Sequence, residues 1–207
     1  MNGVFREIKL MPFDFLDLFI IFFASIFTQN VVLTYFLGIC PFVAVSKEIP
    51  TALGMGMAVI FVMFMTMGLN WPLYHLVLVP FHVEYLQFLV FIIVIATFVQ
   101  IVEIFIDRYS PVLYVSLGVF LPLITVNCAI LGVSLLMVLR EYTYPQCLAF
   151  ALGSGIGWTL AIVAMAGIRQ KLQFSNVPKG LQGPGITMII AGIMAMAFMG
   201  FAGIINM

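Results

Sequence analysis

Charged side chains are scarce in this sequence. Only 8% of its 207 residues are Asp, Glu, Lys or Arg, whereas an ordinary soluble domain carries roughly a quarter. With 64% hydrophobic residues and a mean hydropathy of +1.24, the chain cannot cover a water-facing surface. We therefore expect lipid to surround most of it.

The sequence also lacks the features of several other classes. Its eight basic and eight acidic residues balance, and there is no basic run, which argues against nucleic-acid binding. Three cysteines provide no even set for a disulfide framework. The alternating pattern of a membrane β-barrel is missing. No spacing typical of a serine hydrolase, a phosphate-binding loop or a zinc site occurs. An all-α integral membrane protein remains, because helices satisfy their own backbone in lipid.

Charges and Pro or Gly breaks divide the chain into six apolar segments, and a spanning helix needs about 20 apolar residues. After an N-terminal tail, residues 1–14, the sequence predicts spans at about 15–39, 52–69, 86–106, 112–139, 147–168 and 185–205. We expect Asn70, Trp71 and Pro72 to close the second span. The first span is longer than a signal segment and has no small-residue cleavage site, so we expect it to be retained.

The two halves of this single membrane domain, residues 15–106 and 112–205, share a weak pattern. The motif C-x-x-x-x-V-S begins at Cys40 and at Cys128, and glycine pairs occur in the second and fifth spans at Gly54/Gly56 and Gly153/Gly155. Three spans per half reverse the orientation of the second half, which predicts an inverted 3+3 repeat. A small excess of Lys and Arg after spans one, three and five places both termini outside.

The matched cysteines lie where spans one and four should be interrupted. Pro41 follows Cys40 and Gly38 precedes it, while Pro122 lies six residues before Cys128. Proline breaks or kinks a helix, and glycine adds backbone freedom. Interrupted backbone at membrane depth is tolerated where it is buried in protein or lines a cavity.

Two asparagines, Asn30 and Asn127, can hydrogen-bond backbone groups freed at such breaks, or sulfur nearby. If the halves meet, the thiols of Cys40 and Cys128 approach one point, which suits a soft metal. Two thiolates are half of the four usual for an iron–sulfur cluster, so a second chain of similar design would complete the site. The alternative is that both cysteines are small core residues.

The chain resembles the paired six-helix membrane subunits of two bacterial complexes. The resemblance is carried by NVVLTYFLGICPFVAVSK, FLPLITVNCAILGVSLL, GSGIGWTLAIVAMAGIRQKL and SNVPKGLQGPGITMIIAGIMAMAFMGF, and it extends from about residue 15 through nearly the whole chain. The complexes are the Rnf complex, a ferredoxin:NAD oxidoreductase, and the sodium-translocating NADH:quinone reductase. The short loop LVPFHVEYLQ and the segment SPVLY favour an RnfA-type subunit, whereas TVNC, GSGIGW and REYTY fit the NqrE type.

The resemblance implies a function for the thiols. In this family two homologous subunits, here with a partner of the RnfE or NqrD type, bind one [2Fe–2S] cluster between them, and each contributes one cysteine from each half. The matching residues are Cys40 and Cys128, with Asn30, Gly38 and Asn127 around the cluster. The cluster relays electrons between flavin and iron–sulfur carriers of other subunits in the bacterial cytoplasmic membrane, and is coupled to Na⁺ or H⁺ transport. The chain would belong to an oxidoreductase without being catalytic alone.

Other polar side chains occur outside the cysteine motifs. Glu103 lies near the end of the third span, where an ionisable residue faces a partner or cavity; it either pairs with Arg108 or serves the ion pathway, as the resemblance implies. His75 and His82 fit an aromatic belt at the lipid boundary. Cys147 has no counterpart in the first half and receives no role. A function from another class is a cofactor-free secondary transporter with inverted repeats, in which the cysteines only pack and Glu103 binds substrate or an ion.

Overall fold

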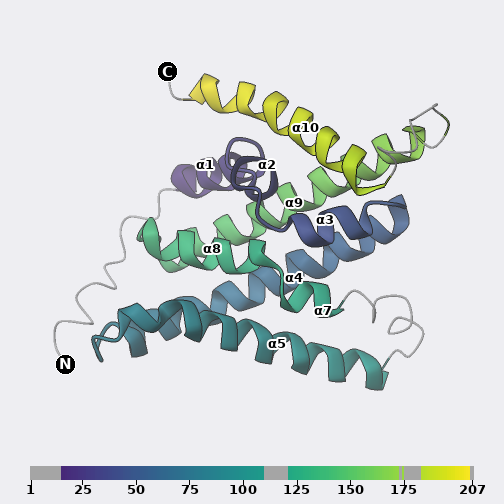
Figure 1. The fold of residues 1–207 in the computed structure, drawn as a ribbon. Helices are drawn as coiled ribbons and strands as arrows, with labels where there is room; N and C mark the ends of the chain where they lie inside the picture. The colour runs from purple at the N-terminus through teal and green to yellow at the C-terminus, as the bar shows by residue number, and fades with distance from the viewer. Residues whose placement is uncertain (1–14, 110–120, 173, 175–182, 206–207) are drawn as a thin grey trace.

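The computed structural model describes residues 15–109, 121–172, 174 and 183–205. Every regular element in these ranges is a helix (Figure 1), which confirms the all-α class. The expected tail, residues 1–14, and the start of the fourth expected span, residues 112–120, lie outside the described residues.

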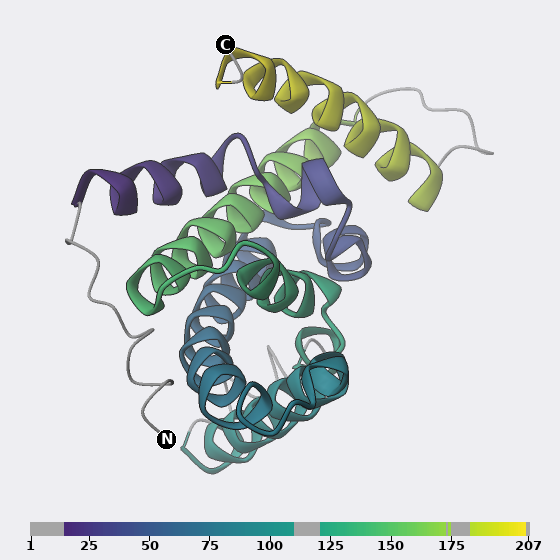
Figure 2. The same ribbon diagram turned by 90° about the vertical axis from the view of Figure 1, so that its left-hand side faces the viewer.

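Four long helices build the body of the protein. They are α4 (Ile49–Leu73), α5 (Gln87–Tyr109), α9 (Tyr144–Leu172) and α10 (Pro184–Ile205). The pair α4 and α9 makes the most extensive helix contact. Figures 1 and 2 both show α5 and α10 at opposite edges, with α4 and α9 between them.

Several segments are suited to a membrane. Among the described residues, four helical segments are long and apolar enough to cross one, namely Ile49–Leu78, Glu84–Ile104, Pro122–Leu139 and Tyr144–Leu172. Two further apolar helical segments, Phe15–Ile26 and Pro184–Gly200, are shorter than these four. A total of six spans therefore stays a prediction.

The expectation of a first span at 15–39 with its break near Cys40 is wrong in part, because this segment contains two breaks. It forms α1 (Phe15–Ile26), α2 (Val31–Tyr35) and α3 (Ile39–Val45). Figure 2 shows α1 lengthwise, whereas α4 is seen nearly end-on, so α1 crosses the long helices. Local caps at the helix ends, described below, redirect the chain twice.

The expected end of the second span is also wrong. Asn70, Trp71 and Pro72 lie inside α4, and the helix continues as a π-helical turn, η2 (Tyr74–Leu78), before a 3₁₀ turn, η3 (Glu84–Leu86). The proline removes one backbone donor, and helices in membranes tolerate this through local π or 3₁₀ adjustment. The Tyr74 N–H accordingly donates to the carbonyls of both Asn70 and Trp71.

Glycines permit the close helix contacts around α9. A β-carbon at Gly155 would lie 3.1 Å from the α-carbon of Ile60 on α4. One at Gly157 would lie 2.9 Å from the Ile26 carbonyl oxygen on α1. Small residues of this kind let helix backbones approach in a membrane.

Candidate functional site

The break in the fourth expected span lies between α7 (Leu121–Thr125) and α8 (Cys128–Leu139). Asn127 caps α8, because its backbone is extended (φ −73°, ψ 109°) and its Oδ1 accepts from the Ala129 N–H at 3.0 Å. Pro122 is not the break itself, since it is the second residue of α7. A proline in a first helical turn loses no intrahelical bond, so the asparagine cap starts the new helix.

Asn30 uses the same cap at the start of α2. Its Oδ1 accepts from the Val32 N–H at 3.2 Å, and its Nδ2 donates to the carbonyls of Ile26, at 3.3 Å, and Gly157, at 2.8 Å. The buried amide thus bonds backbone groups at the end of α1 and the start of α2, which is the role that the sequence suggested for it, and it also ties both to α9.

The break before Cys40 depends on two left-handed residues. Phe36 ends α2 with φ 55° and Gly38 precedes α3 with φ 78°. Cys40 then lies in the first turn of α3, and Cys128 is the first residue of α8. Pro41 lies within that first turn, where its missing N–H has little cost.

One hydrogen bond joins the two cysteine-bearing turns. The backbone N–H of Gly38 donates to Sγ of Cys128 at 2.9 Å, although the two residues belong to opposite halves of the chain. Cys128 is half-buried, whereas Cys40 is exposed on this chain. The turns therefore meet, with one thiol inside the junction and the other facing outward.

Gly38 is enclosed at this junction. A β-carbon there would lie 2.7 Å from Nε1 of Trp158, 2.9 Å from Cβ of Ala129 and 3.0 Å from Oδ1 of Asn127. Positive φ and this crowding both require glycine. The start of α8 and the middle of α9 consequently close over the α-carbon of Gly38.

Two hydrogen-bond donors at the junction have no partner among the described residues. Nε1 of Trp158, whose side chain is 0% exposed, and Nδ2 of Asn127, whose side chain is 3% exposed, are both unpaired. Leaving a buried donor unpaired costs about 1–3 kcal/mol. Such atoms call for an acceptor, and Trp158 is the residue that sequence reasoning missed. The available signal was an indole N–H in the middle of an apolar span.

Two arginines hold the broken first segment. Arg169, near the end of α9, donates to the Val43 carbonyl at 2.9 Å and to Oγ of Ser46 at 2.8 Å, at the end of α3. Arg140, after α8, donates to Oε1 of Gln29 and, at 3.0 Å, to the hydroxyl of Tyr35. Basic groups at the ends of α3 and α2 satisfy carbonyl and side-chain oxygens that the breaks leave open.

Arg140 keeps its charge in this position. Partial burial alone lowers the pKa of the guanidinium, but hydrogen bonds and attraction from the hydroxyls of Tyr142 and Tyr35 raise the pKa of Arg140 above its ordinary value. The side chain also lies over the Phe150 ring, 5.7 Å from its centroid. A charged, multiply bonded arginine thus fixes the segment that links α1 to α2.

Ser134, the serine of the second C-x-x-x-x-V-S motif, is bonded to a central helix as Ser46 is. Oγ of Ser134 on α8 accepts from Nδ2 of Asn70 on α4 at 3.0 Å and donates to the Ile130 carbonyl at 3.1 Å. Ser46 and Ser134 are both fully buried. Each therefore ties a cysteine-bearing helix to one of the two central helices.

The remaining candidates lie apart from the junction. Glu103 is half-buried in α5, and the described residues give it no hydrogen-bond or ion-pair partner. His75 lies in the π-turn, where its ring stacks on Trp71 with 4.2 Å between the ring centroids. Cys147 is buried in the first turn of α9, with Sγ 4.0 Å from the Met67 carbonyl oxygen.

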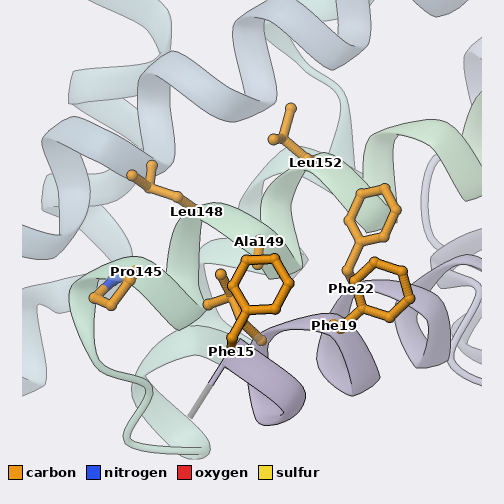
Figure 3. Close-up of a pocket in the computed structure, with 8 residues that line it drawn as sticks. Phe15, Phe19, Phe22, Pro145, Leu148, Ala149 and Leu152 are labelled. Carbon is orange, nitrogen blue, oxygen red and sulfur yellow. The ribbon is translucent and has the colours of Figure 1, made fainter. Parts of the chain in front are cut away.

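A groove of about 370 Å³ lies between α1 and the start of α9. Figure 3 shows aromatic rings of α1, among them Phe15, Phe19 and Phe22, opposite Pro145, Leu148, Ala149 and Leu152 of α9. All of the lining residues are apolar, so the groove offers no group for acid–base chemistry or metal ligation.

The two cysteines of the junction are potential ligands for a soft metal. In the described ranges, no group of three or more His, Cys, Asp or Glu could hold a metal ion. Two thiols, one of them exposed, and two unpaired N–H donors instead suit part of an anionic, sulfur-rich group that a second chain completes. Such a group accepts hydrogen bonds at sulfur and prefers thiolate ligands.

These features define the chain as a helical membrane protein with discontinuous helices, in which the break before Cys40 contacts the start of the helix that begins at Cys128. Comparison with known proteins agrees with this class: the family model described as "Rnf-Nqr subunit, membrane protein" matches residues 18–205. The chain belongs to the Rnf-Nqr family of membrane subunits, which confirms the resemblance found in the sequence.

Relatives from both branches of the family are similar to the chain. The A subunit of the ion-translocating oxidoreductase complex of Syntrophotalea carbinolica is 51% identical over 189 residues, covering 91% of this chain and 98% of the relative. The E subunit of the Na(+)-translocating NADH-quinone reductase of Dichelobacter nodosus is 51% identical over 191 residues, with coverage of 87% and 94%. The protein of the same name from Neisseria meningitidis serogroup C is 50% identical over 189 residues, with coverage of 89% and 96%.

Proposed function

We propose that this chain is an electron-relaying membrane subunit of an ion-translocating oxidoreductase complex. The relatives in both branches carry names of such subunits. The observation that carries the proposal is the hydrogen bond from Gly38 to the sulfur of Cys128. It brings together two helix breaks that have no evident purpose in a protein that merely fills lipid.

Cys40 and Cys128 would hold half of a [2Fe–2S] cluster, and a homologous subunit of the RnfE or NqrD type would hold the other half. The exposure of Cys40 supports a ligand shared with a second chain. The unpaired N–H groups of Trp158 and Asn127 support an electron-rich occupant. When bound, the cluster supplies a one-electron carrier inside the membrane.

The residues of this chain would position that carrier and keep water from it. Gly38 lets three segments close around the junction, and Asn127 starts α8 at the ligand Cys128. Arg169 and Ser46 fix the far end of α3, which bears Cys40. Ligands held by packing and by outer hydrogen bonds keep a metal group in one geometry.

An inverted repeat is supported by matched contacts. The register that aligns Gly56 with Gly155 also aligns Ile60 with Thr159 and Asn70 with Arg169. Gly56 packs on Thr159, while Gly155 packs on Ile60. In the same way Ser46 bonds Arg169, while its match Ser134 bonds Asn70. Pairs that exchange partners in this manner are what a two-fold axis between two halves produces.

We assign the chain to the Rnf type, with the NqrE type as the alternative. It would lie in a bacterial cytoplasmic membrane with both termini outside, beside subunits that carry flavins and iron–sulfur clusters. Na⁺ or H⁺ would be the transported ion. Glu103 would serve its pathway, since a carboxylate on a membrane helix with no partner among the described residues is costly without a function.

Metal analysis of the complex tests this function. Purified with its homologous partner, the wild-type pair should contain two irons and show a [2Fe–2S] spectrum. Changing Cys40 or Cys128 to alanine should remove the iron and the spectrum, because two of the four ligands come from this chain. Cys147→Ala is the matched control and should keep both. A wild-type pair without iron would favour the cofactor-free transporter.

A further inference from the structure

We propose that Trp158 is a hydrogen-bond donor to a sulfur atom of the cluster held at Cys128, and that it raises the reduction potential of that cluster. The inference rests on the proposed function, because it assigns a residue to the same junction. It adds Trp158 to the site, and it concerns the reduction potential of the cluster, which the cysteine ligands alone do not determine.

The first observation is the environment of the indole. Trp158 is 0% exposed in the middle of α9, and its Nε1 has no partner among the described residues. The other tryptophan, Trp71, has its Nε1 bonded to the Tyr142 carbonyl at 2.9 Å. A buried indole N–H usually finds an acceptor, so the junction should contain one that the described residues do not provide.

The second observation is the position of this N–H. It lies 2.7 Å from the place of a β-carbon on Gly38, and the Gly38 N–H donates to Sγ of Cys128 at 2.9 Å. The indole therefore lies beside a backbone donor that already reaches a ligand sulfur. Nδ2 of Asn127, also unpaired, precedes Cys128 directly. Two unpaired donors gather where a thiolate would bind its metal.

The chemistry of the junction points to sulfur as the acceptor for the indole N–H of Trp158. Oδ1 of Asn127 lies near the indole but already accepts from the Ala129 N–H. Thiolate or sulfide sulfur in a cluster is electron-rich, carries no proton and accepts from several donors. Hydrogen bonds to these sulfurs stabilise the reduced form, which carries more negative charge, and so raise the reduction potential.

The experiment uses the assembled complex and the change Trp158→Phe, which removes the N–H and keeps an aromatic ring. Redox titration followed by electron paramagnetic resonance should show a cluster with a lower potential than in the wild type. Trp71→Phe, the matched control, removes an indole whose N–H is already bonded to the Tyr142 carbonyl and should leave the potential unchanged. Wild-type potential in Trp158→Phe would overturn the inference while leaving the cluster in place.

A second measurement does not depend on the variant folding. In wild-type complex labelled with ¹⁵N at the indole nitrogen, pulsed electron paramagnetic resonance should detect coupling between a tryptophan nitrogen and the reduced cluster. The coupling should survive Trp71→Phe and disappear in Trp158→Phe. No coupling in the wild type would mean that the indole bonds to Asn127 instead, and would overturn the inference. Absence of any cluster signal would overturn the proposed function itself.

Discussion

Arg169, at one end of α9, donates to the hydroxyl of Ser46 across 2.8 Å, and the same nitrogen donates to the Val43 carbonyl at 2.9 Å. The arginine thus holds the carboxyl end of α3, whose first turn carries Cys40. Because α3 has only seven residues, it depends on such tertiary contacts rather than on its own helix propensity.

Replacing Arg169 with glutamine should destabilise the protein by about 1–3 kcal/mol, the usual worth of a hydrogen bond to a charged group. Arg169→Lys should recover part of the loss, since lysine offers charge without the planar fork. Thermal unfolding of the purified complex in detergent measures both effects. Lys171→Gln, at an exposed position on the same helix end, is the control. Equal stability of all three variants would contradict a holding role for Arg169.

A side chain at Gly38 should be poorly tolerated for two separable reasons. Alanine in a left-handed conformation costs about 1–2 kcal/mol, and the approach to Trp158, Ala129 and Asn127 adds about 1–3 kcal/mol of overpacking. Gly183→Ala isolates the first effect, because its φ is 96° with open space around it. Gly38→Ala should therefore lower the melting temperature more than Gly183→Ala, and a smaller drop would refute the crowded junction.

The helix-packing glycines should differ according to what they touch. A β-carbon at Gly153 would meet the Phe22 carbonyl oxygen, a backbone atom, at 2.6 Å, whereas one at Gly132 would meet the end of the flexible Leu37 side chain. Gly153→Ala should cost about 1–3 kcal/mol, and Gly132→Ala clearly less. Gly167→Ala, with nothing within 4 Å, should be neutral or stabilising, as glycine disfavours a helix interior. Melting temperatures that rise from Gly153→Ala through Gly132→Ala to Gly167→Ala would support these helix contacts. The reverse order would contradict them.

The three cysteines should react differently with a membrane-permeant maleimide. In the isolated chain, exposed Cys40 should be modified and buried Cys147 should resist until the protein unfolds. In the assembled complex, Cys40 should be protected if a partner covers it. Mass spectrometry of peptides from single-cysteine variants distinguishes the sites. Equal labelling of Cys40 before and after assembly would show that it faces lipid rather than a second polypeptide.

Part of this structure could be predicted from the sequence. Scarce charge and long apolar runs predict membrane helices, and the proline and glycine residues near Cys40 and Cys128 predict a break beside each cysteine, but they do not predict the further break before Asn30. Proline does not make the breaks. They are made by the caps Asn30 and Asn127 and by the left-handed residues Phe36 and Gly38. Cap geometry depends on backbone angles, which an apolar sequence pattern does not encode.

Other features depend on tertiary contacts that no local pattern contains. The sequence places a helix end at Pro72, but the bundle stabilises a continuous α-to-π segment there. The crossing of α1 results from its packing on α9 at Gly153 and Gly157. Trp158 carries an indole N–H in an apolar span, but only its burial without a partner among the described residues singles it out.

The lengths of the two cysteine-bearing helices determine how deep the junction lies. Figure 1 shows α3 and α8 leaving the middle of the molecule toward opposite ends. The seven residues of α3 rise about 10 Å and the twelve of α8 about 18 Å, which together nearly match a hydrocarbon thickness of about 30 Å. If the junction holds the proposed cluster and both helices run along the membrane normal, an electron that stops there would have crossed roughly a third of the membrane voltage from one face, with two-thirds left to the other. The electrical field would therefore act unequally on its arrival and its departure.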